Sequence, residues 1–172
     1  MLAGLLRDAM VAGQMPFLTV SSASMAPLLR VGDEVGIQPV ALSQLRIGDV
    51  VVVCHQQLIL THRFCGRWAG KSDDTFVTRG DRSRMYDSPW TESQLLGRVV
   101  ARRRQKQLLW LDFGPGRWLS RRLAVMAQVE QKALKRWPFA EAQPQKSRTP
   151  QMVRITFRAL ASLLTQVVEK GM

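Results

Sequence analysis

Three short clusters in the first half of the chain combine residue types that can perform nucleophilic catalysis. Ser22-Ala23-Ser24-Met25-Ala26-Pro27 supplies hydroxyls, Thr61-His62-Arg63 supplies an imidazole, and Arg79-Gly80-Asp81, with the later Asp87-Ser88, supplies carboxylates. A serine hydroxyl is a poor nucleophile at neutral pH and needs a neighbouring base. Histidine suits that task because its ordinary pKa is about 6.5, and it works best when an acceptor orients its second ring nitrogen.

Each cluster also has an ordinary structural explanation. A lone Ser-x-Ser is typical of loops, and a lone histidine in a strand is usually a hydrogen-bonded core residue. Asp87, which precedes Ser88 and Pro89, can simply begin a turn. The occurrence of all three clusters in one order and at plausible spacing is what favours a catalytic site.

Together with Gly-Asp pairs at 32–33 and 48–49, the clusters resemble the type I signal peptidase family. The family has four sequence motifs in a fixed order. The first reads Ser-x-Ser-Met-x-Pro-x-Leu-x-x-Gly-Asp, and the second is Gly-Asp followed by four apolar residues. The third is a base beside an arginine, and the fourth is Gly-Asp with a later Asp. All occur in this order over roughly residues 18–101. His62 fills the base position, as in the endoplasmic-reticulum and archaeal branch. No membrane anchor of the kind usual at the family's N-terminus is expected here, and the resemblance does not explain residues after 101.

The resemblance implies a role for each site residue. Ser24 takes the nucleophile position, His62 the base position and Asp87 the position of the residue that orients the base. Asp81 and Arg63 are expected to support the site. Ser22 and the Ser24 N–H are expected to form the oxyanion hole, because residues two apart on an extended segment point to the same face. No metal ion or other cofactor is expected.

The implied activity is that of a serine endopeptidase that cleaves a precursor or leader peptide, and it has two rivals. A repressor-type self-cleaving peptidase would use a Ser-Lys dyad, but the only lysine before residue 106 is Lys71, nine residues from the base position. A non-catalytic basic module that binds anionic membrane or nucleic acid is the other rival.

The patterns around the clusters predict an α+β fold. Short strands are expected at 17–21, 33–39, 49–55, 58–66, 75–79, 96–101 and 107–113, and the run Val50–Val53 is typical of a strand buried on both faces. Helical spacing of apolar residues then indicates two basic amphipathic helices, at 117–137 and 151–169. We therefore expect a mainly-β peptidase core (about 17–113) within a domain at 1–113, and a helical extension at 114–172.

The two cysteines indicate neither a disulfide nor a metal site. In a hairpin of 50–55 and 58–65, Cys54 lies opposite Ile59 rather than Cys65, so free thiols are expected. The N-terminal twenty residues are interrupted by Arg7-Asp8 and Pro16 and lack the order of a signal peptide. A cytoplasmic or peripheral membrane location is expected.

The net charge of +12 is concentrated at one end of the chain. Residues 1–100 carry ten Lys/Arg and nine Asp/Glu, whereas residues 101–172 carry fifteen and four. Such asymmetry favours an anionic partner. We expect peripheral contact of residues 117–169 with an anionic membrane in preference to nucleic acid, and simple packing of the helices on the core is the alternative.

Overall fold

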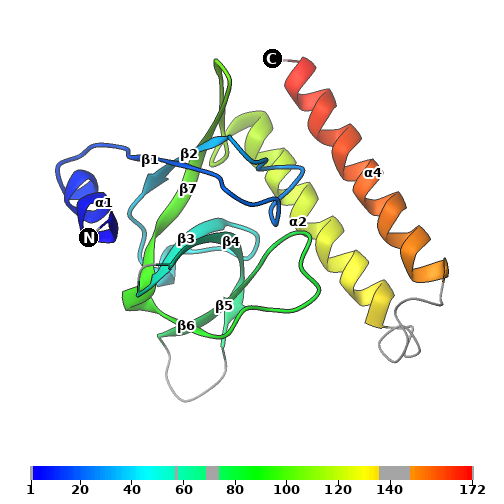
Figure 1. Cartoon of the computed structure of the whole chain (residues 1–172), viewed down its shortest axis with the longest axis horizontal. Helices are drawn as coiled ribbons and strands as arrows, with labels where there is room; N and C mark the ends of the chain where they lie inside the picture. The colour runs from blue at the N-terminus through cyan, green and yellow to red at the C-terminus, as the bar shows by residue number, and fades with distance from the viewer. Residues whose placement is uncertain (1, 57, 69–73, 136–147, 172) are drawn as a thin grey trace.

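The computed structural model describes residues 2–56, 58–68, 74–135 and 148–171. In this part of the chain, the expected α+β class is confirmed as an eight-stranded antiparallel sheet and three helices (Figure 1). The strands are β1 (Phe17–Thr19), β2 (Glu34–Gln38), β3 (Val50–His55), β4 (Leu58–Arg67), β5 (Thr75–Arg79), β6 (Trp90–Thr91), β7 (Leu95–Arg104) and β8 (Gln107–Trp110). The helices are α1 (Leu2–Val11), α2 (Gly114–Lys135) and α4 (Arg148–Lys170), with single 3₁₀ turns at Leu42–Gln44 and Glu92–Gln94.

The sheet runs in the order β1-β2-β7-β3-β4-β5-β6, and β8 pairs with β7. β7 is the long central strand, and it pairs with β2, β3 and β8. In the β3–β4 hairpin, Cys54 is paired with Ile59, as the sequence predicts, and both cysteines are free. The same register places Val51 beside His62 and Val50 beside Arg63, so these two neighbours on β4 face opposite sides of the sheet.

β3 is buried on both faces because a separate apolar cluster packs against each face of the strand. Val50 and Val52 belong to a large cluster that also contains Leu119 and Leu123 of α2 and residues of α1 and α4. Val51 and Val53 belong to a second cluster around Phe64 and Phe76. The run of four valines thus joins the two halves of the core, as expected for a strand buried on both faces.

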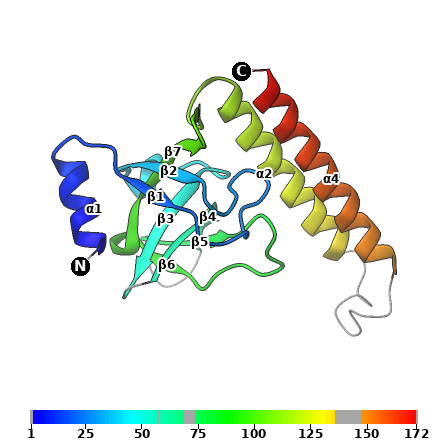
Figure 2. The same cartoon turned by 45° about the horizontal axis from the view of Figure 1, so that its top comes forward.

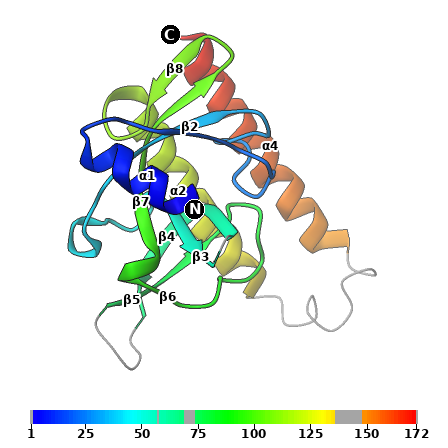
Figure 3. The same ribbon diagram turned by 60° about the vertical axis from the view of Figure 1, so that its left-hand side comes forward.

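Figures 1 and 2 both show α2 and α4 side by side, with α2 between the sheet and α4. Leu119 and Leu123 of α2 and Ala161 of α4 are buried in the same cluster as the sheet residues. Near the C-terminus of α4, Glu169 pairs with Arg102 and Arg104 of β7, where the β7–β8 hairpin approaches the end of the chain (Figure 3). These contacts fix the N-terminal half of α2 and the C-terminal half of α4 to the sheet.

Several boundaries differ from the sequence-based expectations. The sequence patterns did not predict α1. This helix is stabilised because its Leu6 and Met10 side chains are buried in the core. Residues 111–113 leave the predicted strand 107–113 and turn into α2, which begins at Gly114. A side chain at Gly116 would place its Cβ 1.9 Å from the Trp110 carbonyl oxygen, so this close turn requires glycine.

The second predicted helix, 151–169, is slightly longer as α4, whereas residues 136–137 of the first lie outside the described residues. Most of the loop predicted at 69–74 also lies outside them. None of the helices in the described part of the chain is long and apolar enough to cross a membrane.

Candidate active site

Ser24 lies at the start of a tight turn that is anchored in the core. Met25, Leu28 and Leu29 are almost completely buried directly after it, and the Leu29 N–H donates to the Met25 carbonyl at 3.0 Å. Ser24 itself is only partly buried. The apolar side chains therefore hold the turn in place while the hydroxyl stays at the surface.

The Gly-Asp pairs at 32–33 and 48–49 have the same local structure. Gly32 and Gly48 adopt positive φ angles of 87° and 100°, which favour glycine. The carboxylates of Asp33 and Asp49 accept the N–H three residues earlier, from Arg30 at 2.7 Å and Arg46 at 2.9 Å. Both Gly-Asp pairs thus stabilise tight turns. The turn at 32–33 ends the segment that carries Ser24.

Ser24, His62 and Asp87 form a continuous hydrogen-bonded chain. The Ser24 Oγ lies 3.1 Å from His62 Nε2, and His62 Nδ1 lies 2.6 Å from Asp87 Oδ2. An ionised carboxylate can only accept, so Nδ1 carries the proton toward Asp87 and the Nε2 lone pair faces the serine hydroxyl. The histidine is therefore held in the tautomer that can remove a proton from Ser24.

Thr78 holds the Asp87 carboxylate and is itself held by Trp90, and neither residue carries a signal in the sequence motifs. Thr78 Oγ1 donates to the same Asp87 oxygen at 2.5 Å, and Trp90 Nε1 donates to Thr78 Oγ1 at 2.8 Å. The Asp87 N–H also donates to the Thr78 carbonyl at 2.9 Å. Because Thr78 is completely buried on β5, it fixes the carboxylate that lies behind the histidine.

Gly80 leaves space at the point where the Ser24 and His62 side chains meet. A Cβ at this position would lie 2.9 Å from His62 Nε2 and 3.1 Å from Ser24 Cβ. The loop after Gly80 is hydrogen-bonded to the turn that carries Ser24, since the Arg82 N–H donates to the Ser24 carbonyl at 2.9 Å. A side chain at Gly80 would therefore push the two groups apart.

Ser22 lies beside the nucleophile, with its hydroxyl 3.2 Å from Ser24 Oγ. Ser22 lies between β1 and the turn that begins at Ser24, and it is exposed. The Ser22 O–H is therefore free to rotate toward an oxygen that develops negative charge on a group attached to Ser24.

Arg63 and Asp81 form a buried pair below the site. The guanidinium donates to both Asp81 oxygens, at 2.7 and 2.6 Å, and to the Gly48 carbonyl at 2.6 Å. Burial alone would lower the pKa of Arg63, but the Asp81 carboxylate raises it above its ordinary value. The geometry gives this pair a supporting position, because it fixes β4 to the Gly80 loop without a hydrogen bond to His62.

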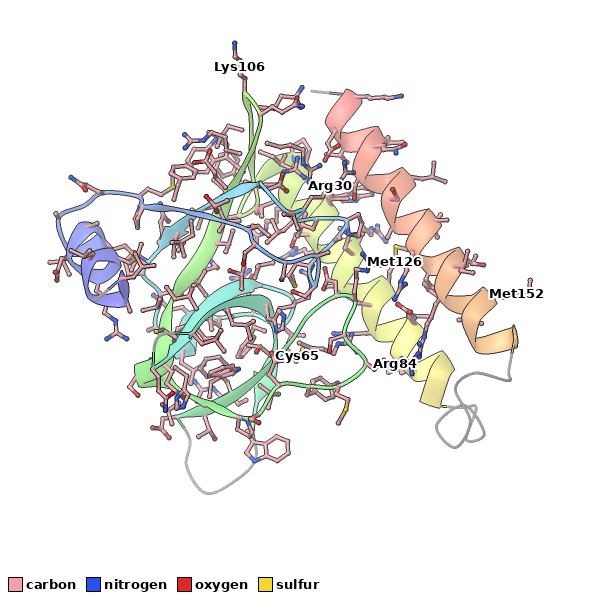
Figure 4. All side chains as sticks on the ribbon, viewed as in Figure 1. Arg30, Cys65, Arg84, Lys106, Met126 and Met152 are labelled. Carbon is pink, nitrogen blue, oxygen red and sulfur yellow. The ribbon has the colours of Figure 1, made fainter. Side chains whose placement is uncertain are left out.

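α2 is hydrogen-bonded to β4, which carries His62, and to the neighbouring strand β5. Arg63 Nη1 donates to Ser120 Oγ at 3.1 Å, and Arg79 Nη2 donates to the Ala127 carbonyl at 3.0 Å. Met126 of α2, on the side toward α4 (Figure 4), lines a small hollow together with Ala26 and Pro27 from the nucleophile turn. α2 therefore packs directly against the strands and the turn that surround Ser24 and His62.

The other groups that the sequence offers as candidates, His55, Lys71 and the two cysteines, are not part of this hydrogen-bonded chain where the structure describes them. His55 is at the end of β3, where its Nδ1 is 2.7 Å from Gln94 Nε2. Lys71 lies outside the described residues. Burial raises the pKa of the Cys65 thiol. Among the described residues, no group of three or more His, Cys, Asp and Glu side chains is arranged to hold a metal ion.

Neither a scan against protein-family models nor a search of curated proteins found a match to this chain.

Proposed function

We propose that this chain is a serine endopeptidase similar to signal peptidases, with Ser24 as nucleophile and His62 as general base. The observation that carries this proposal is the chain from Ser24 Oγ through His62 to Asp87, with both links at hydrogen-bonding distance. The chain gives a serine hydroxyl a base and gives that base an orienting carboxylate, and such triads are recognised by geometry and roles rather than by chain order.

The geometry supports an acyl-enzyme mechanism. Ser24 Oγ attacks the scissile carbonyl carbon as its proton passes to His62 Nε2, and Asp87 stabilises the imidazolium that forms. The carbonyl oxygen becomes an oxyanion, for which the Ser22 O–H and the Ser24 N–H are the candidate donors. His62 then protonates the leaving amine as the C–N bond breaks. Water, deprotonated by His62, hydrolyses the Ser24 ester and restores the free enzyme.

The substrate class follows from the signal-peptidase resemblance. Cleavage after a small residue in a precursor or leader peptide is the activity that this resemblance implies. The histidine at the base position favours this family over the repressor-type self-cleaving peptidases, which use lysine. The direct coupling of Ser24 to His62 also favours an enzyme over a non-catalytic basic module.

A proteome-derived peptide library tests the proposal, because it samples many cleavage sequences at once. The wild-type chain should generate new peptide termini that mass spectrometry detects, and Ser24→Ala should remove them. Ser21→Ala is the matched control, because this exposed serine is outside the hydrogen-bonded chain. Identical cleavage products from wild type and Ser24→Ala would contradict the proposal.

A further inference from the structure

A cleft of about 290 Å³ between the loop before β3 and the N-terminal half of α2 is lined by four arginines. Arg46 comes from the loop, Arg98 from β7, and Arg117 and Arg121 from α2. Only two acidic residues, Asp49 and Asp112, are among the residues that line it. This arginine cleft is separate from the catalytic chain, with which it shares no residue.

The charges in the arginine cleft are only partly compensated. Asp49 lies 3.7 Å from Arg98, and Arg117 donates to the Asp112 carbonyl oxygen at 3.2 Å. Arg46 and Arg121 are exposed, and within the described part of the chain neither guanidinium has a hydrogen-bonding or ion-pair partner. The cleft therefore presents two unpaired guanidinium groups and an excess of positive charge.

This arrangement suits an oxygen-rich anion. Guanidinium groups stay charged at all physiological pH values, and their planar N–H pairs match the oxygens of phosphate. The cleft is open to solvent, so its arginines are accessible without a change in the fold. The ligand chemistry that it matches best is a phosphate group.

The apolar surroundings of the cleft identify the source of that phosphate. Ile47 lines it and is 62% exposed, although an isoleucine gains nothing from contact with a small hydrophilic ion. A neighbouring hollow shares Arg117 and Arg121 and adds Trp118 and Val125. Trp118 is exposed, and the Arg122 guanidinium lies 5.5 Å from the centre of its ring. Tryptophan and aliphatic side chains between arginines are typical of surfaces that bind at a lipid interface.

We propose that the arginine cleft binds the phosphate of an anionic lipid headgroup, with Ile47 and Trp118 against the bilayer surface. This inference is independent of the peptidase activity. It places membrane contact on the loop before β3 and on the exposed side of α2, rather than over the whole of residues 117–169. Nucleic acid could use the same arginines, but it would leave Ile47 and Val125 exposed.

Co-sedimentation of the full chain with vesicles tests this proposal. The wild type should bind vesicles of phosphatidylglycerol and phosphatidylcholine, bind pure phosphatidylcholine weakly, and lose affinity as salt is added. The double variant Arg46→Gln/Arg121→Gln should bind the anionic vesicles about 25-fold more weakly, since each basic residue contributes roughly a factor of five at such a surface. Both substitutions change exposed side chains that make no hydrogen bond or ion pair within the described residues, so folding should be unaffected.

The matched control is Arg84→Gln/Lys106→Gln, which lowers the net charge equally at two exposed positions outside the cleft (Figure 4). This variant should keep most of the vesicle affinity. Equal losses in both double variants would show that only net charge matters and would overturn the proposal. So would wild-type protein that ignores anionic vesicles, complete competition by millimolar inorganic phosphate, or tighter binding of a DNA duplex with the same dependence on Arg46 and Arg121.

Discussion

Arginines behave differently in the two regions that meet at α2. Below the active site, Arg63 is buried and paired with Asp81 by two hydrogen bonds. On the other side of the Gly48 turn, Arg46 and Arg121 are exposed, and neither has such a partner in the described part of the chain. Gly48 and Ser120 contribute to both regions, because each accepts from Arg63 and also lines the arginine cleft.

The comparison distinguishes arginines that stabilise the fold from arginines that are available to bind a ligand. A buried guanidinium must be paired, because an uncompensated charge in the core is very costly. An exposed guanidinium stabilises the fold little, so a cluster of unpaired ones needs another explanation. Substitutions around the active site should therefore affect catalysis or stability, whereas those in the arginine cleft should affect ligand binding alone.

The largest expected effects concern the catalytic chain. His62→Ala should lower kcat/KM by about 10⁴ or more, and Asp87→Asn by about 10²–10⁴, because the first removes the base and the second disturbs its tautomer. Both are measured on a peptide identified in the library experiment. His55→Ala is the control, since this histidine is bound to Gln94 away from the site. A full rate in Asp87→Asn would mean that Ser24 and His62 act as a dyad.

The next effect is on stability. Asp81→Asn should lower the free energy of unfolding by about 3–5 kcal/mol, because it leaves the buried charge of Arg63 without its partner. Thermal denaturation should show a decrease in Tm of about 6–20 °C. Glu34→Gln, which breaks the exposed pair with Arg103, should change Tm little. Similar Tm values for the two variants would show that the buried pair stabilises the fold no more than the exposed pair does, which would contradict this prediction.

Thr78→Val tests whether the Thr78 hydroxyl positions the Asp87 carboxylate and, through it, His62. Loss of one hydrogen bond to the carboxylate should lower kcat about tenfold while KM changes less than about twofold. Thr165→Val is the matched control, because this equally buried threonine donates to the Ala161 carbonyl within α4. A purely structural role for Thr78 would give the two variants similar kcat values and similar decreases in Tm.

The smallest expected effect involves Glu130 of α2, whose pKa is raised by burial, against the influence of Arg158 and Arg154. A carboxyl with a raised pKa in the folded state binds more protons folded than unfolded, so its contribution to stability is lost as the pH rises through that pKa. Glu130→Gln should therefore raise Tm slightly at pH 7, by about 1–2 °C, and leave it unchanged at about pH 4. A lower Tm for the variant at pH 7 would show that the ionised carboxylate is stabilising.

Local patterns predicted much of the sheet. Strand 75–79 has the predicted bounds, and the Cys54–Ile59 register follows from the predicted hairpin. These features depend on side-chain alternation and turn length, which a short stretch of sequence contains. α1 was missed because its burial depends on contacts with strands distant in the sequence.

The site was predictable only where a motif spans it. Ser24, His62 and Asp87 were named from the order of the clusters, and the structure brings them together. Thr78 and Trp90 could not be found this way, because a threonine or a tryptophan in a strand carries no local sign of the carboxylate behind it. The arginine cleft was also missed, since Arg46, Arg98 and Arg121 are distant in the chain and only the fold makes them neighbours.

The coupling of Ser24 to His62 can be measured without any substrate, through the reactivity of a thiol at the nucleophile position. In a background with Cys54→Ala and Cys65→Ser, the thiol of Ser24→Cys should react rapidly with iodoacetamide at pH 6.5, because an adjacent imidazole favours the thiolate. Adding His62→Ala should slow this alkylation at least about tenfold. An alkylation rate that is the same with and without His62 would contradict its assignment as the base that activates Ser24.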